Sequence, residues 1–486
     1  MRSTYRLAAI TAAAIGALVP LSAGPAALAS AGPGGTGDRV AAYAAPAGHG
    51  LAAGPPGGTT LWLARYQGTG HGVGYATSAA VSPDGSMVFV AGAVTAAYDA
   101  ATGGLVWAVP TGTGINPFSH FNAAVSPDGS TVFVTDGSTG PSGASQYSTV
   151  AFDAASGTQL WAAAYHGPGV GDDFPTAIAA SRGRVFVTGV SSNTPTVGVL
   201  DENAYATVAY DAVTGAQLWV SRYSDGNRDA GASAIAAAPG GSQVYVTGGS
   251  AGPSGKASFA TVAYRAATGA RVWLARYNQD RKNAGAVAVV TGPDGSRVYV
   301  TGTTHGPRGG QVFTTAAYAA STGAMRWVAH YTGPAAGNSA ESMAISKDGS
   351  ELAITGQGTA PDGHPSYATL AYRTSSGTRL WVRYYGGTSV DKFGLAASVA
   401  LSPDGSTVVV TGDVNGNPPG NASDYGTVAY RAATGATRWV RLYAGPQPAN
   451  DEGLSVVVSP DGSKVFVTGG SPGPTGTAFA TLAYQS

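Results

Sequence analysis

The sequence of 486 residues contains no cysteine, which excludes a disulfide framework, a cysteine-linked lipid anchor and a haem attachment motif. Charge is also scarce: Asp, Glu, Lys and Arg make up 11% of the chain, compared with roughly 25% in ordinary domains. The 26 basic and 26 acidic residues cancel. Because phosphate binding needs clustered Lys and Arg, this composition argues against nucleic acid as a partner.

Long apolar runs are missing outside the N-terminus, so no segment is predicted to span a membrane. Residues 1–29 have the pattern of a secretory signal peptide, with a basic start, an apolar run over 7–21 and an Ala-x-Ala site at 27–29. We therefore expect a secreted, extracellular protein. Residues 30–58, rich in Gly, Ala and Pro, are expected to form a disordered leader, and residues 59–486 a single domain.

Helical periodicity is absent after the leader, and an internal repeat takes its place. Its clearest copy is YATVAYDAVTGAQLWVSRY at 205–223. The chain stops inside another copy, FATLAYQS, and the missing half, TTLWLARY, stands at 59–66. Eight tryptophans mark the repeat: Trp62, Trp107, Trp161, Trp219, Trp273, Trp327, Trp381 and Trp439.

Four strand-like runs fill each repeat, and we letter them A to D from the axis outward. After Trp219, strand A is the small-residue run 230–238, while B (243–248) and C (259–264) are rich in β-branched and aromatic residues. The run that contains the tryptophan is strand D. Four strands in about 54 residues, repeated eight times, predict an all-β fold, an eight-bladed β-propeller of four-stranded antiparallel blades, with seven blades as the alternative.

The two ends of the chain are expected to share one blade. The last repeat supplies strands A, B and C at 453–459, 464–468 and 478–484, and residues 60–66 supply its strand D. Pairing the ends in this way removes open sheet edges, which otherwise promote aggregation.

The tryptophans are predicted to dock neighbouring blades. Trp219 and Tyr223 share one face of strand D, where a flat ring can stack on the backbone of the next blade and bury roughly 150–250 Å². A glycine in each C–D hairpin is expected to need a positive φ. These glycines are Gly103, Gly157, Gly215, Gly269, Gly323, Gly377 and Gly435.

The spacing A-x-D-x-x-T-G-x-x-x-W, at Ala209, Asp211, Thr214, Gly215 and Trp219, resembles the docking motif of quinoprotein alcohol-dehydrogenase-like (PQQ-like) propellers. The longer unit resembles the secreted bacterial β-propeller repeats known as SBBP. The first resemblance implies, for members that bind the quinone, a Trp floor, a Ca²⁺ with carboxylate ligands and often adjacent cysteines. Since the chain has no cysteine and the repeat uses every Trp, we predict no cofactor, with Ca²⁺ as an alternative and PQQ disfavoured.

The two sides of the disc are expected to differ. The A–B and C–D turns are short and nearly identical, and they lie on one side, which we name the turn face. The D–A and B–C connections, such as 191–203, 362–365 and 413–424, vary and lie on the other side, which we name the loop face. Variable loops on a rigid scaffold commonly carry binding. We therefore predict a monomeric, non-catalytic scaffold that binds a protein or glycan in the envelope or extracellular space.

A polar residue precedes or begins most A strands on the loop face, and two interpretations stay open. The first is an Asx turn that satisfies local backbone N–H groups. The second is an oxygen-rich ring that binds Ca²⁺ or a polyhydroxyl ligand, with the metal undetermined. The candidate ligand-binding residues are Asp172, Asp173, Asp229, Asn283, Asn338, Asp391 and Asp451.

The turn face has a charge asymmetry. The third motif position is Asp99, Asp153 and Asp211 in the first three copies. One interpretation is a basic arc that binds an anionic partner, and the other is recent duplication of one repeat. In the later four copies that position is Arg265, Ala319, Arg373 and Arg431, and Arg271, Arg326, Arg379 and Arg438 are added.

Enzymatic activity is an alternative. A hydrolase or lyase that acts on polysaccharides needs paired carboxylates at the channel mouth. Asp172/Asp173 and Asp451/Glu452 are adjacent in sequence, so on an extended chain their side chains point in different directions. A PQQ-dependent dehydrogenase is the other enzymatic alternative, and no catalytic residue is predicted.

Overall fold

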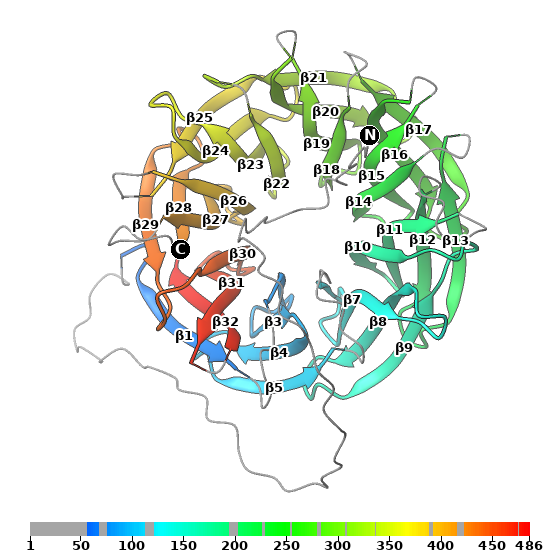
Figure 1. The fold of residues 1–486 in the computed structure, drawn as a ribbon, viewed down its shortest axis with the longest axis horizontal. Coiled ribbons are helices and arrows are strands. Elements are labelled where there is room, and N and C mark those ends of the chain that lie inside the picture. Colours follow the sequence, from blue (N-terminus) through cyan, green and yellow to red (C-terminus); the bar gives the residue numbers. More distant parts are fainter. Residues whose placement is uncertain are drawn as a thin grey trace, which may run out of the picture.

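The computed structural model describes residues 56–67, 75–111, 121–193, 203–225, 229–252, 255–278, 283–306, 309–335, 337–387, 392–415, 422–474 and 476–486. The regular elements of these residues are 32 β-strands in eight four-stranded antiparallel sheets, arranged as the blades of a ring (Figure 1). No helix in the described part of the chain is long and apolar enough to cross a membrane.

The first four blades have the following strands, from the axis outward. Blade 1 is β2 (Ser78–Val81), β3 (Met87–Ala91), β4 (Val94–Asp99) and β5 (Leu105–Pro110). Blade 2 is β6 (Asn122–Val125), β7 (Thr131–Thr139), β8 (Ser145–Asp153) and β9 (Gln159–Tyr165). Blade 3 is β10 (Asp173–Ser181), β11 (Arg184–Ser192), β12 (Asn203–Asp211) and β13 (Gln217–Tyr223). Blade 4 is β14 (Ala230–Ala237), β15 (Gln243–Ala251), β16 (Ala257–Arg265) and β17 (Arg271–Tyr277).

The other four blades follow the same order. Blade 5 is β18 (Gly285–Thr291), β19 (Arg297–His305), β20 (Gln311–Ala319) and β21 (Met325–Tyr331). Blade 6 is β22 (Ser339–Ile345), β23 (Glu351–Thr359), β24 (Pro365–Arg373) and β25 (Arg379–Tyr385). Blade 7 is β26 (Gly394–Leu401), β27 (Thr407–Asn415), β28 (Ser423–Arg431) and β29 (Thr437–Tyr443). Blade 8 is β30 (Glu452–Val458), β31 (Lys464–Gly473), β32 (Gly476–Gln485) and β1 (Thr60–Tyr66).

The predicted fold is confirmed, and the alternative of seven blades is wrong. β1 pairs antiparallel with β32, with Tyr66 opposite Phe479 and Trp62 opposite Ala483, so the first and last described strands lie in blade 8. The B and C strands are longer than the sequence pattern indicates. In blade 4, pairing continues past Gly248 to Ala251 opposite Ala257, because the backbone ladder does not depend on apolar side chains.

Each tryptophan packs on the next blade, as Trp273 illustrates. Its indole Nε1 donates a hydrogen bond to the carbonyl oxygen of Ala320 (2.7 Å), and its ring lies between Tyr245 and Tyr318, with centroids 5.8 and 6.4 Å away. Gly323 of the next C–D turn has a φ of +71°, as predicted, and a Cβ on it would lie 2.7 Å from the indole ring. The glycine is therefore required for its backbone angle and for ring contact.

In blade 8, the equivalent of this C–D turn is formed by two separate segments, residues 58–59 and the end of β32. Gly58 N donates to Gln485 O (2.7 Å) and Gln485 N to Thr59 O (2.8 Å), as Gly269 N donates to Arg265 O (2.9 Å) in blade 4. Gly58 has a φ of +80°, and a Cβ on it would lie 2.8 Å from the ring of Trp439. Gly58, at the end of the expected leader, thus takes the place of the turn glycine.

Two glycines of blade 5 separate the cost of the backbone angle from the cost of the ring contact. Gly295 has a φ of +69°, and a Cβ on it would have no atom within 4 Å, whereas a Cβ on Gly323 would meet the Trp273 ring. We expect Gly295→Ala to lower the free energy of unfolding by about 1–2 kcal/mol and Gly323→Ala by at least about 2 kcal/mol more. Chemical denaturation followed by tryptophan fluorescence measures both, and equal losses would contradict the docking role.

Candidate functional site

The predicted ligand residues fall into two structural positions on the loop face. In the first position, the side chain bridges to the strand C start of the preceding blade. Asp172 Oδ1, for example, accepts a hydrogen bond from Ser145 N at 2.7 Å. Asn283 Oδ1 accepts from Ala257 N (3.2 Å), Asp229 Oδ1 from Asn203 Nδ2 (3.1 Å), and Asn450 Oδ1, which the sequence interpretation missed, from Ser423 N (3.1 Å).

In the second position, the buried side chain forms hydrogen bonds with backbone groups of its own D–A connection. The buried carboxylate of Asp173 accepts hydrogen bonds from Gly167 N (2.8 Å) and Ser192 N (3.0 Å), and pairs with His166 Nδ1 at 2.6 Å. Asn338, also buried, donates to the carbonyl oxygens of Thr332 (2.8 Å) and Ala335 (2.7 Å).

Asp451 holds the corresponding place in blade 8, where its Oδ2 accepts a hydrogen bond from Gly445 N. Burial raises the pKa of Asp451, in spite of hydrogen bonds from Ser471 and Gly445. Asp391 lies outside the described residues. The contacts of the described members match those of Asx-type turns and bridges between blades, and no group of three or more His, Asp or Glu in the described ranges is placed to hold a metal ion. Ligand binding by these residues stays a prediction.

The structure brings together an acid pair that the sequence interpretation did not find. Asp413 on β27 and Glu452 at the start of β30 are each 8% exposed, and they lie on neighbouring blades. The Gly453 amide donates to the Asp413 carboxylate, whose Oδ1 has no hydrogen-bond partner among the described residues. Burial, and then the charge of Glu452, raise the pKa of Asp413 well above its usual range, and burial raises that of Glu452.

A signal for this pair does exist in the sequence. The residue after the recurring Thr-Gly of strand B is apolar or uncharged in blades 3 to 6, as in TGV, TGG, TGT and TGQ, but it is Asp413 in blade 7. The sequence interpretation paired Glu452 with its neighbour Asp451, whereas its electrostatic partner belongs to the adjacent blade.

Arginines at the rim form a second contact between blades. Arg276, three residues after Trp273, donates to Tyr223 OH of the preceding blade (3.0 Å). It also fills the space over its own B–C connection, where it donates to Ser250 O (2.9 Å) and Ser258 Oγ (2.9 Å). Arg222 in blade 3 and Arg65 in blade 8 have the same role.

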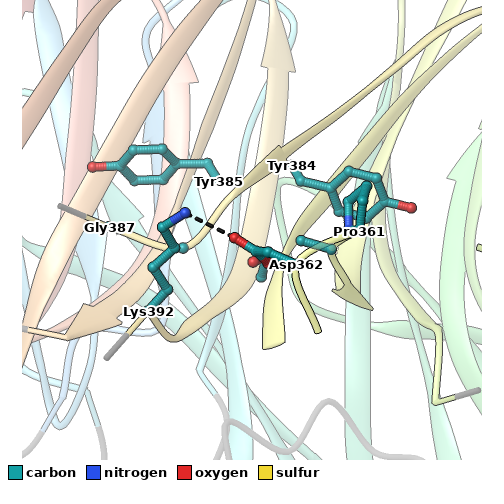
Figure 2. A pocket seen from close by; sticks show the side chains of 9 residues that line it. Pro361, Asp362, Tyr384, Tyr385, Gly387 and Lys392 are labelled. Atoms are coloured by element: carbon teal, nitrogen blue, oxygen red, sulfur yellow. Dashed lines mark hydrogen bonds and ion pairs between the residues drawn. The ribbon is translucent and has the colours of Figure 1, made fainter. Parts of the chain in front are cut away.

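Blade 6 has Tyr384 at this rim position, and a pocket of about 320 Å³ lies there (Figure 2). Tyr384 OH bonds to Tyr331 OH and leaves the space beside Ser366, the counterpart of Ser258, without a guanidinium. The Asp362 carboxylate and Lys392 Nζ, 2.8 Å apart, meet in the pocket between Tyr384 and Tyr385, whose rings project in opposite directions. Ala360, Pro361, Gly386 and Gly387 complete the lining.

Blade 7 breaks the rim pattern in another way. The position that contacts Tyr385 from the next blade is Leu442, which packs in the same apolar cluster and offers no hydrogen bond. Tyr385 OH is buried with no partner among the described residues, and burial raises the pKa of Tyr385 to about 12. The pocket and the unpaired Tyr385 hydroxyl therefore both belong to blade 6 and its connection to blade 7.

Comparisons with known proteins agree with this architecture. Residues 91–292 match the sequence model of the family described as outer membrane protein assembly factor BamB. The chain is similar to the structure of BamB from Moraxella catarrhalis, with 13% identity and a TM-score of 0.51 over 88% of this chain and 99% of that one. A search of curated proteins finds no match.

Two further solved structures are similar at comparable levels. The quinohemoprotein alcohol dehydrogenase of Comamonas testosteroni has 13% identity and a TM-score of 0.54 over 85% of this chain and 75% of that one. Sqt1 of Saccharomyces cerevisiae has 11% identity and a TM-score of 0.55 over 89% and 99%. The fold and its docking tryptophans define an eight-bladed β-propeller. More narrowly, residues 91–292 resemble the PQQ-like propellers in sequence.

The residues of this chain do not fit the quinone site that the PQQ-like resemblance implies. Seven tryptophans donate to a carbonyl of the next blade, and the ring of Trp439 lies over Gly58, so no tryptophan is left to form a cofactor floor. The sequence also has no cysteine for the adjacent pair. Of the groups that the resemblance implies, the free tryptophan and the cysteine pair are therefore not available in this chain.

The unpaired hydroxyl predicts an unusual response to mutation. We expect Tyr385→Phe to leave the free energy of unfolding unchanged or raise it by about 1 kcal/mol, because a buried hydroxyl without a partner is removed. The matched change Tyr223→Phe removes the acceptor of Arg276 and is expected to cost about 1 kcal/mol. Denaturant unfolding of the two variants measures the difference, and a loss of equal size in both would contradict this assignment.

Glu341 on the inner strand β22 predicts a pH dependence. Burial raises its pKa from 4.5 to about 7, although Ser339 Oγ donates to Oε1 (3.1 Å). The raised pKa means that its contribution to stability is complete below pH 4.5 and is lost as the pH rises through about 7. Glu341→Gln is therefore expected to raise the free energy of unfolding by about 3 kcal/mol at pH 8 and to change little near pH 4.

The control for this prediction is Asp294, an acid whose pKa is lowered rather than raised. Hydrogen bonds from Ser296 lower the pKa of Asp294, so Asp294→Asn should destabilise the protein at neutral pH and lose its effect as the pH falls through the lowered pKa. Between pH 4 and pH 8, above the usual pKa of Asp294, the Asp294→Asn effect should stay constant while the Glu341→Gln effect changes, so unfolding curves at pH 4, 6 and 8 distinguish the two. A Glu341→Gln effect that is independent of pH would contradict the assignment.

Proposed function

We propose that this protein is a secreted, non-catalytic scaffold that binds a glycan through its loop face. The observation that carries the proposal is the pocket at the loop-face end of blade 6, in which two tyrosines flank an exposed ion pair. Its volume of about 320 Å³ is at the lower end of the range for ligand pockets, roughly 300–1,000 Å³, and suits one or two sugar units. The signal-like residues 1–29 support export.

The lining has the chemistry that saccharides require. Tyr384 and Tyr385 offer aromatic surface for the C–H faces of a sugar ring. A sugar hydroxyl can donate a hydrogen bond to the Asp362 carboxylate and accept one from the Lys392 ammonium group. The pair is about half exposed, and it is therefore available to a ligand at little cost in desolvation.

A rigid ring with variable connections suits recognition rather than turnover. Both sides of the pocket are anchored: Tyr384 by its bond to Tyr331, and Gly386 by accepting a hydrogen bond from Phe393 N (3.0 Å). The family matched by residues 91–292 is described as an assembly factor, which is a binding role, and it supports a scaffold function. A protein partner on the same face is the alternative occupant.

A hydrolase that acts on polysaccharides is the second candidate, favoured by the pair Asp413 and Glu452 on adjacent blades. The general acid of such enzymes is a carboxyl group with a raised pKa, and Asp413 and Glu452 both have raised pKa values. Their exposure of 8% each weighs against direct contact with a substrate. Release of reducing ends from polysaccharides by the wild type, abolished in Asp413→Asn, is the result that would favour this alternative.

Glycan-array binding of the purified protein tests the scaffold proposal. We expect binding to defined oligosaccharides that weakens at least tenfold in the double variant Asp362→Ala/Lys392→Ala. Because exposed ion pairs contribute about 0–1 kcal/mol, the double variant should melt close to the wild type. The matched control is Lys256→Ala, an exposed lysine in the B–C connection of blade 4. Binding that is equal in all three proteins, or no binding to any glycan, would refute the pocket assignment.

A further inference from the structure

The C–D turns on the turn face carry a side-chain cap in blades 1 to 3. Asp99 Oδ1 accepts hydrogen bonds from Ala101 N (3.1 Å), Thr102 N (2.8 Å) and Thr102 Oγ1 (2.8 Å). These bonds lower the pKa of Asp99, with the largest contribution from the Thr102 hydroxyl. Asp153 and Asp211 cap their turns in the same way. The local fold of this turn therefore favours aspartate.

Blades 4, 6 and 7 have arginine at the capping position. The backbone bonds of the turn persist, since Gly269 N donates to Arg265 O (2.9 Å), as Gly103 N does to Asp99 O (2.8 Å). The side-chain cap is lost, however, because a guanidinium has no acceptor to offer the backbone amides. Arg265, Arg373 and Arg431 are thus not explained by the turn itself.

These arginines are exposed and without an acidic partner. With Arg271, Arg326 and Arg438 they form what we name the basic arc, which runs over blades 4 to 7, half of the ring in Figure 1. All six are exposed, and none forms an ion pair within the described residues. The three ion pairs found in that part of the chain, at Asp173, Asp225 and Asp362, belong to the loop-face connections.

Apolar side chains accompany the charges on the outermost strands of the arc. Leu274 on β17, Met325 on β21 and Leu380 on β25 are 37, 43 and 38% exposed. Val106, Leu160 and Leu218 on the outermost strands of blades 1 to 3 are 48, 49 and 44% exposed, so these apolar surfaces recur around the ring; in the arc they lie on the same blades as the exposed guanidinium groups. A polyphosphate has no apolar face to use this pattern, whereas a chain of sugar acids has both carboxylates and C–H faces.

We propose that the basic arc binds a linear acidic polysaccharide, of the uronic-acid class, laid along the turn face of blades 4 to 7. Guanidinium groups bind carboxylates through two parallel hydrogen bonds. A single exposed ion pair contributes little, but a polymer that engages several blades gains from multivalency. The C–D turns of blades 1 to 3 carry aspartate in place of these arginines, while the exposed aspartates Asp294, Asp348 and Asp404 of the A–B turns lie on the same face within the arc, so we expect the polymer to follow the C–D turns. This surface is on the opposite side from the glycan pocket and is independent of it.

The test uses a triple variant that is designed to keep the fold. Arg265→Asp, Arg373→Asp and Arg431→Asp install the cap of blades 1 to 3 while inverting the charge of the arc. We expect polygalacturonate to bind the wild-type protein with an affinity that falls as salt rises, and to bind the triple variant at least tenfold more weakly. The melting temperature of the variant should be unchanged or higher, because the turns are now capped.

Controls separate the alternatives. Arg373→Asp alone should weaken polygalacturonate binding, while Lys256→Asp, the same charge change on the loop face, should not. Equal binding by wild type and triple variant would overturn the proposal, as would linear polyphosphate or duplex DNA binding as tightly as polygalacturonate. Self-association at low salt that the triple variant abolishes, without polygalacturonate binding, would overturn it too and assign the arc to a second copy of the chain instead. The pocket variant Asp362→Ala/Lys392→Ala should retain polygalacturonate binding.

Discussion

The contact of an indole ring with a turn glycine of the next blade is the interaction on which the rest of the structure depends. A four-stranded sheet with two largely apolar faces must be covered on both sides, and each blade of this ring covers its neighbour. The Trp273 ring lies on Gly323 at a distance that excludes a side chain, and its N–H is satisfied by the Ala320 carbonyl. Because the ring of blades is closed, the last contact joins the first described residues to the last strand: Gly58 serves as the turn glycine beneath Trp439.

Hydrogen bonds on the loop face add to the tryptophan contacts that hold neighbouring blades together. Asp172 accepts a hydrogen bond from the preceding blade, and Asp173 accepts one from within its own D–A connection. Arg276 links Tyr223 of the preceding blade to the B–C connection of blade 4. Where one of these contacts is replaced, a feature with functional potential results. Tyr384, which contacts blade 5 in place of an arginine, leaves the pocket of blade 6. Leu442 of blade 7 leaves Tyr385 OH without a partner among the described residues.

The two faces of the disc are built by different rules. On the turn face, short turns with the same hydrogen bonds recur from blade to blade, so variation there is confined to exposed positions such as Arg265 and Asp211. On the loop face, variation changes which groups are buried, as the acid pair Asp413 and Glu452 shows. The blades therefore differ from one another mainly in charge on the turn face and in shape on the loop face.

The sequence by itself determined the strand content, the number of blades and the pairing of 60–66 with the last repeat, because these follow from local periodicity and from the split copy of the motif. It also indicated the positive φ of glycines such as Gly323, since the turn chemistry is local. Only the tertiary structure decided that Asp413 lies near Glu452, that Asp173 is buried on backbone amides, and that Tyr384 borders a pocket. These neighbours come from different blades or connections, and the packing angle between sheets, which no single repeat encodes, sets which side chains meet.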